Sequence, residues 1–106
     1  MARSIVWTHD AVSDLEAIAD YIARDSASYA AAVIRELLDA GNSLDRFYQR
    51  GRIVPETRQT AIRELIVREY RLIYRVEKTR IVIVTIVHGR RDLRKLWAKA
   101  EKNKKP

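Results

Sequence analysis

One stretch of seven residues constrains the fold more than any other part of this chain. Residues 81–87 read Ile-Val-Ile-Val-Thr-Ile-Val, an almost unbroken run of β-branched apolar side chains. Alternate residues of a strand point to opposite sides of a sheet, so a strand of this composition is apolar on both faces. The run therefore predicts a strand over residues 80–88 that lies centrally in a sheet.

Two further strands are expected directly before this one. Residues 62–67 and 70–77 are rich in Ile, Val, Leu and Tyr, and residues 77–80 are short enough for a hairpin connection. Residues 4–8, Ser-Ile-Val-Trp-Thr, predict another strand near the start of the chain. Residues 47–60 contain a glycine and a proline and predict a loop.

Two amphipathic helices are expected between the first strand and that loop. In residues 9–25 the apolar side chains recur at helical spacing, and Asp10 is the expected N-cap. The Asp-Ser-Ala-Ser stretch at 25–28 breaks the pattern and offers a new cap. A second helix is expected from about residue 28 to about residue 46, continuing through Gly41. The short link between the two predicts an antiparallel helical hairpin.

The remaining residues complete the predicted architecture. Residues 92–100 predict a last short helix, so the order of elements is β-αα-βββ-α. This order is typical of an α+β domain in which a helical hairpin packs on a small, mostly antiparallel sheet. A chain of 106 residues has the length of one domain. We expect this domain to span residues 1–98, with residues 99–106 as a basic, flexible tail.

The charge is divided unevenly along the chain. Residues 1–50 carry five Lys and Arg against eight Asp and Glu, whereas residues 51–106 carry sixteen against six, so the balances are −3 and +10. Such asymmetry is typical of a protein whose basic face meets nucleic acid or an acidic partner, although it can also serve solubility alone. The absence of cysteine excludes disulfides and thiolate metal ligands. No apolar run suits a signal peptide or a spanning helix, so we expect a cytoplasmic protein.

Four side chains of the predicted sheet form a candidate site for an anion. Arg71 and Arg75 fall on the same side of their strand, and Arg63 and His88 on the neighbouring strands are expected to converge with them. Guanidinium groups bind phosphate or carboxylate in a bidentate manner, and histidine exchanges protons near neutral pH. Together they would suffice for RNA cleavage. Each is also compatible with a structural role, as a solvated arginine or a hydrogen-bonded histidine.

A group of cations follows the last strand, where burial gives no reason for them, and we interpret it as functional. Its members are Arg90, Arg91, Arg94 and Lys95. Other chemistries have little support. Three glycines form no phosphate-binding loop, and the two histidines, far apart in sequence, do not have the spacing of a zinc site. No cofactor and no metal is therefore expected.

Several short motifs occur in a fixed order along the chain. They are GRIVPE (51–56), IREL (62–65), YRLIYRV (70–76) and VHGRRDL (87–93), behind the SIVWT strand and the DLEAIADYI helix. In this order they closely resemble the RelE/ParE superfamily of toxins from bacterial type II toxin–antitoxin systems, over residues 4–96.

The resemblance implies a fold and a partner. The fold is a helical hairpin on an antiparallel sheet, as expected above. The partner is a cognate antitoxin, whose acidic and otherwise flexible C-terminal segment orders on binding to the basic toxin. The residues expected to bind that segment are Arg63, Arg71 and Arg75.

The resemblance leaves two targets open. RelE-like members cleave messenger RNA in the ribosomal A site, whereas ParE-like members poison DNA gyrase. Arg71 matches the phosphate-binding strand arginine of the nucleases, and His88 lies in the region of their late general acid or base. No tyrosine follows Tyr74, however, although many nuclease members carry one late in the chain. The lysine pair of RelE is not evident either, since the segment before the sheet carries arginines instead: Arg50, Arg52 and Arg58.

The motifs resemble the ParE branch more closely than the RelE branch. We therefore expect a non-enzymatic toxin that inhibits DNA gyrase, and we expect the cations at 90, 91, 94 and 95 to contact the target. The alternative is a ribosome-dependent mRNA endonuclease, with Arg71 on the scissile phosphate and His88 as the proton carrier. A third reading is a degenerate toxin that only binds its antitoxin.

Overall fold

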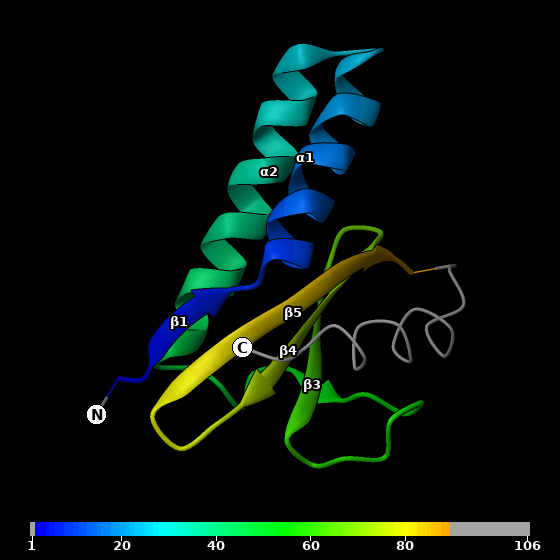
Figure 1. The fold of residues 1–106 in the computed structure, drawn as a ribbon. Coiled ribbons are helices and arrows are strands. Elements are labelled where there is room, and N and C mark those ends of the chain that lie inside the picture. The colour runs from blue at the N-terminus through cyan, green and yellow to red at the C-terminus, as the bar shows by residue number, and fades with distance from the viewer. Residues whose placement is uncertain (1, 90–106) are drawn as a thin grey trace.

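The computed structural model describes residues 2–89, and within them it contains two α-helices, a 3₁₀ turn and five strands (Figure 1). In chain order these are β1 (Ser4–Trp7), α1 (His9–Ala23), α2 (Ala27–Asn42), the 3₁₀ turn η1 (Ser43–Asp45), β2 (Arg52–Ile53), β3 (Ile62–Val67), β4 (Tyr70–Val76) and β5 (Arg80–His88). None of the helices within the described range is long and apolar enough to cross a membrane. The predicted helix at 92–100 and the predicted tail at 99–106 lie outside the described residues.

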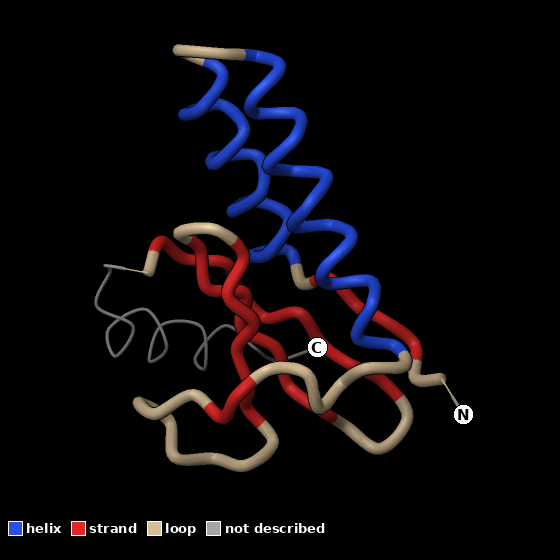
Figure 2. Tube along the Cα trace, turned by 180° about the vertical axis from the view of Figure 1, so that it is seen from behind, coloured by secondary structure: helices blue, strands red, loops and turns tan. Residues whose placement is uncertain are grey.

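The strands form one mixed sheet in the order β1-β5-β4-β3-β2. β1 runs parallel to β5, and the other neighbours are antiparallel. The apolar run at 81–87 is buried along its whole length and lies between β1 and β4, which confirms its predicted central position. The parallel pair requires a crossover connection, and the helical hairpin begins that connection. In Figures 1 and 2 this hairpin rests against the sheet near β1 and extends well past it.

The start of α1 differs from the prediction. The N-cap is Thr8, whose hydroxyl oxygen accepts a hydrogen bond from the amide of Ala11, while Asp10 lies in the first turn. Thr8 also donates its hydroxyl proton to the carbonyl oxygen of Val84 at 2.7 Å. The cap is therefore fixed by contact with β5, which no pattern within residues 4–25 reveals.

The second helix follows its prediction closely and ends slightly earlier. Ser26 caps it by accepting from the amide of Tyr29, and the helix passes through Gly41 before it tightens into η1. Gly41 serves close packing, since a Cβ atom there would lie 2.5 Å from the ring of Trp7. A larger residue would push α2 away from β1.

The two sides of the sheet carry separate clusters. The main core lies between the sheet and the helices, where residues of α1 and α2 meet alternate residues of β4 and the side chains of Ile81, Ile83 and Ile86 of β5. Its fully buried members include Val33, Leu37, Leu72, Tyr74 and Ile83. The opposite side, called the outer face below, carries a smaller cluster formed by Val54, Ile62, Ile73 and Val87. Val54 comes from the segment predicted as a loop, which also contains the unpredicted strand β2.

Candidate functional site

The outer face of β4 presents the two arginines that the sequence singled out. Arg71, Ile73 and Arg75 point to this side, whereas Tyr70, Leu72 and Tyr74 point to the helices, which confirms the prediction that Arg71 and Arg75 share one side of the strand. Arg71 and Arg75 are separated by Ile73, so their Cα atoms are about 13 Å apart along the strand. They therefore belong to two ion-pair clusters rather than to one.

Arg71 is held by two glutamates. Its Nη1 and Nη2 atoms donate to the two carboxylate oxygens of Glu56 at 3.0 and 2.9 Å, and its Nε donates to Glu64 at 2.5 Å. The exposed fractions of these side chains are 10% for Arg71, 26% for Glu56 and 0% for Glu64. Every nitrogen of this guanidinium thus donates to a carboxylate of the same chain.

Arg52 completes the first cluster. Its Nε donates to the second carboxylate oxygen of Glu64, so this buried carboxylate lies between two guanidinium groups. Hydrogen bonding from Arg71 lowers the pKa of Glu56 below its ordinary value, and the pairing with Glu56 raises the pKa of Arg71. Two arginines and two glutamates balance in charge, so the cluster as it stands is electrically neutral.

Arg75 belongs to the second cluster, toward the other end of β4. Its Nε donates to Glu77 at 2.9 Å, and the other carboxylate oxygen of Glu77 accepts from Arg80 at 2.5 Å. Hydrogen bonds from Arg80 and then Arg75 lower the pKa of Glu77. The Nη1 atom of Arg75 is buried, and among the described residues it has no hydrogen-bond partner.

Arg63 and His88 lie on the helix side of the sheet, so the predicted convergence with Arg71 and Arg75 is wrong. Arg63 pairs across the strands with Tyr74 and donates to the carbonyl oxygen of Gly51 at 2.9 Å. His88 pairs with Tyr70, and their rings meet edge to face with centroids 5.8 Å apart. Residues paired in this way share a face, and a shift of one residue in register exchanges the faces. The register between strands was not available from the sequence.

The predicted target-binding residues follow β5 in the sequence. Arg90, Arg91, Arg94 and Lys95 all lie outside residues 2–89, the part of the chain that the structure describes. Their assignment as target-binding residues stays a prediction from the sequence.

Sequence reasoning missed the two acidic members of the Arg71 cluster. Glu64 occurs in the motif IREL, where a charge between Ile62 and Ile66 on one face of the strand was the available signal. Glu56 lies in the loop after β2 and reaches Arg71 across 15 positions of sequence. No local pattern predicts such a contact.

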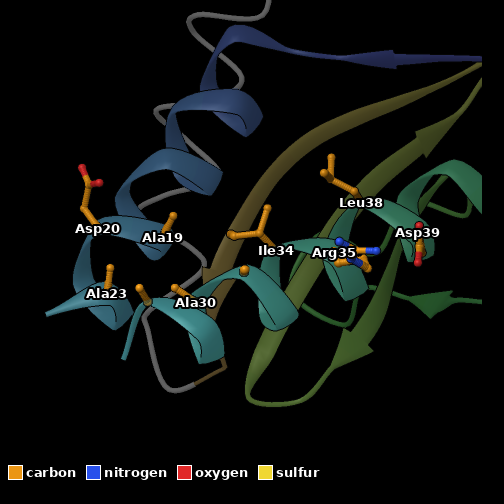
Figure 3. Close-up of a pocket in the computed structure, with 10 residues that line it drawn as sticks. Ala19, Asp20, Ala23, Ala30, Ile34, Arg35, Leu38 and Asp39 are labelled. Carbon is orange, nitrogen blue, oxygen red and sulfur yellow. The ribbon is translucent and has the colours of Figure 1, made fainter. Parts of the chain in front are cut away.

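A groove runs along the helical hairpin. It has a volume of about 600 Å³ and is lined mainly by alanines of both helices, together with Ile34 and Leu38 of α2. Figure 3 shows these side chains with Asp20, Arg35 and Asp39 beside them. The groove is apolar with charges at its margin.

Comparison with known proteins gives a family for the sequence. Residues 5–93 match the model of the family described as the ParE toxin of the type II toxin–antitoxin system parDE. One relative, Toxin RelE2 of Caulobacter vibrioides, is 38% identical over 88 residues, which cover 82% of this chain and 96% of that protein.

Solved toxin structures share the fold. A structure of the chromosomal ParDE system from P. aeruginosa superposes with a TM-score of 0.69 at 23% identity, over 82% of this chain and 96% of that chain. A mutant of the E. coli toxin RelE in the free state superposes with a TM-score of 0.64 at 14% identity, over 97% and 98% of the two chains. The predicted α+β architecture of the RelE/ParE type is thereby confirmed.

Proposed function

The chain belongs to the ParE toxin family of type II toxin–antitoxin systems, within the RelE/ParE superfamily, and from this premise we propose that it is a ParE-like inhibitor of DNA gyrase. A cognate antitoxin neutralises it in the cytoplasm. On this proposal the toxin acts by binding its target, and it performs no chemistry of its own.

One observation carries the choice of a binding toxin over a nuclease. A nuclease of the expected kind needs Arg71 free to bind the scissile phosphate and His88 on the same side to move a proton. Arg71 instead donates to Glu56 and Glu64, and His88 lies on the opposite side of the sheet. The two expected catalytic groups are separated by the sheet, and the arginine is already neutralised.

Contact with the target is assigned to the cations that follow β5. The sequence from Arg90 to Lys95 carries four positive charges among six residues, which suits attraction to an acidic surface. Gyrase supercoiling and cleavage-complex assays with the purified toxin test this assignment. Inhibition with trapped DNA breaks is expected, and unaffected gyrase would contradict the proposal.

A double variant locates the contact on the chain. Arg90→Ala with Arg91→Ala is expected to weaken gyrase inhibition at least tenfold. The matched control is Arg24→Ala with Arg46→Ala, which removes the same charge from exposed positions of the described chain. An equal loss of gyrase inhibition in both double variants would show that net charge alone governs it. Full inhibition by the Arg90→Ala, Arg91→Ala variant would overturn the assignment.

The antitoxin contact is proposed on the basic half of the chain. Residues 51–106 carry a net charge of +10, which an acidic segment complements. Of the arginines expected there, Arg75 has a buried Nη1 donor without a partner among the described residues, and a carboxylate that reaches this atom would gain its hydrogen bond. Arg63 lies on the helix side, and Arg71 can bind an external carboxylate only after it releases Glu56.

The ribonuclease remains the second candidate, because the relative at 38% identity is named RelE2. Purified toxin would be added to translating ribosomes, and cleavage of the message in the A site would be measured. In that case His88→Ala should slow cleavage by roughly 10²–10⁴, the usual contribution of a general acid or base. If the chain affects neither gyrase nor message and is harmless when expressed alone, it retains only antitoxin binding.

A further inference from the structure

The guanidinium of Arg71 has one edge bound by a buried carboxylate and another bound by a more exposed carboxylate. Its Nε is fixed by Glu64, whose side chain is fully buried and is also bound by Arg52. The second edge carries Nη1 and Nη2, which donate in parallel to the two oxygens of Glu56. Because Glu64 sets the orientation, this edge would keep its position if Glu56 moved away.

Glu56 is the more exposed of the two glutamates in the cluster. Its side chain is 26% exposed, whereas that of Glu64 is fully buried, and it lies on a turn in which the amides of Thr57 and Arg58 both donate to the carbonyl oxygen of Val54. Val54 is buried in the outer-face cluster and anchors the turn at its base, whereas residues 55, 56 and 58–60 are exposed. The turn can therefore release Glu56 without disturbing the sheet beneath it.

We propose that Glu56 is a resident ligand of a carboxylate-binding site on Arg71, and that an acidic side chain of a partner polypeptide exchanges with it. Under the proposed function that partner is the antitoxin, and the proposal rests on that function only for the source of the acidic chain. The contact between Glu56 and Arg71 is then autoinhibitory, because it keeps the site closed until a competing carboxylate arrives.

The charge of the cluster favours a carboxylate over other anions. Without Glu56, Arg71 and Arg52 face only Glu64, so one negative charge is missing. A carboxylate replaces Glu56 charge for charge and matches the planar fork of the guanidinium. Inorganic phosphate carries more than one negative charge at neutral pH and would lie beside the Glu64 carboxylate, which repels it.

Removal of the resident carboxylate tests the proposal. The full-length Glu56→Gln variant and the wild-type protein are titrated with a hexaglutamate peptide at 0.15 M salt, and the dissociation constants are compared. An internal competitor acts at an effective concentration of about a millimolar or more. We therefore expect Glu56→Gln to bind the peptide about tenfold more tightly than wild type, and equal or weaker binding would overturn the proposal.

Glu36→Gln is the matched control, because it removes one charge and releases one arginine, Arg68, from a single carboxylate. Arg68 is 38% exposed, and Tyr29 rather than a second carboxylate is its other partner. We expect Glu36→Gln to change the dissociation constant for hexaglutamate by less than about twofold. An equal gain in both variants would show that net charge alone governs binding and would overturn the proposal.

Two further measurements separate the remaining outcomes. Inorganic phosphate and a hexauridylate RNA are titrated in parallel, and a larger gain for either would replace the carboxylate assignment with a phosphate site. In wild type, the side-chain carboxyl ¹³C resonance of Glu56 should move when hexaglutamate binds, which needs no variant to fold. Binding without that change would contradict the exchange. None of these readouts involves gyrase, so a failure here is distinct from a failure of the proposed function.

Discussion

At the scale of single residues, the ion pair between Arg71 and Glu64 joins two side chains that depend on each other. Glu64 is fully buried and Arg71 nearly so, and removal of one partner leaves the other charge in a poorly solvated place. Outside such sites, ion pairs at the surface contribute little to stability. Arg71 and Arg75, near the two ends of β4, therefore differ in their contribution to stability, although both pair with glutamate.

Arg71→Met should lower the free energy of unfolding by roughly 3–5 kcal/mol, because it leaves Glu64 charged and buried with Arg52 as its remaining partner. Arg80→Ala, which breaks a half-exposed pair with Glu77, should cost less than about 1 kcal/mol. Urea unfolding measures both. The double variant Arg71→Met with Glu64→Leu should recover most of the loss, since both charges are then absent. Similar values for the two single variants would contradict this account.

Glu56 should make stability dependent on pH. Its pKa in the folded protein lies below the ordinary value of 4.5, chiefly because Arg71 donates to it. The stability that this shift provides is complete above about pH 4.5 and is lost as the pH falls through the pKa of the folded state. The melting temperature of the Glu56→Gln variant should therefore fall less steeply with acid than that of wild type, and thermal unfolding between pH 6 and 3 measures both. Glu16→Gln, on the exposed side of α1, controls for charge, and an equal slope in Glu56→Gln and wild type would contradict the prediction.

At the scale of elements, the junction between β1 and α1 holds the hairpin on the sheet. Thr8 caps the helix and donates to β5, and Asp14, in the second turn, accepts from the hydroxyl of Thr85 and the amide of Ile86. These contacts occur where β1 ends and β5 would otherwise expose an edge. The side chains of Thr8 and Asp14 thus provide hydrogen bonds to β5 beyond the end of β1.

Thr8→Ala should destabilise the protein by about 1–2 kcal/mol, since it removes the N-cap and the hydrogen bond to Val84 together. Thr8→Ser keeps the hydroxyl and should lower the free energy of unfolding much less. Asp10→Ala, at the position that the sequence pattern favours as the cap, should cost less than about 1 kcal/mol through the helix dipole alone. Chemical denaturation of the three variants measures the order. A larger loss for Asp10→Ala than for Thr8→Ala would restore Asp10 as the cap.

At the scale of the whole molecule, the chain combines an acidic N-terminal half with a basic C-terminal half. Five strands and two helices enclose the core within residues 2–89, and the net charge of +10 falls on residues 51–106. The single-domain boundary at residue 98 stays a prediction. A chain that ends at residue 98 should have the same free energy of unfolding in urea as the full chain, within about 0.5 kcal/mol, because residues 99–106 are charged or small. A marked loss would place the boundary later.

The sequence by itself determined the first strand, the two helices and the last three strands of the described residues in their order, whereas β2 was missed. Periodicity specified the helical hairpin, the three consecutive strands and the central position of residues 81–87, because burial of apolar side chains repeats with the geometry of each element. The shared face of Arg71 and Arg75 was also visible locally, and ordered motifs led to the correct superfamily.

Only the tertiary structure decided how residues on different strands meet. It placed Arg63 and His88 on the other side of the sheet from Arg71 and assigned Thr8 as the N-cap of α1. It also brought Glu56 into contact with the guanidinium of Arg71, 15 residues away in the sequence. Strand register and loop paths depend on contacts across the whole fold, and a shift of one residue would exchange the faces of a strand. A candidate site assembled from several strands therefore depends on the register, which the spacing of residues within each strand does not contain.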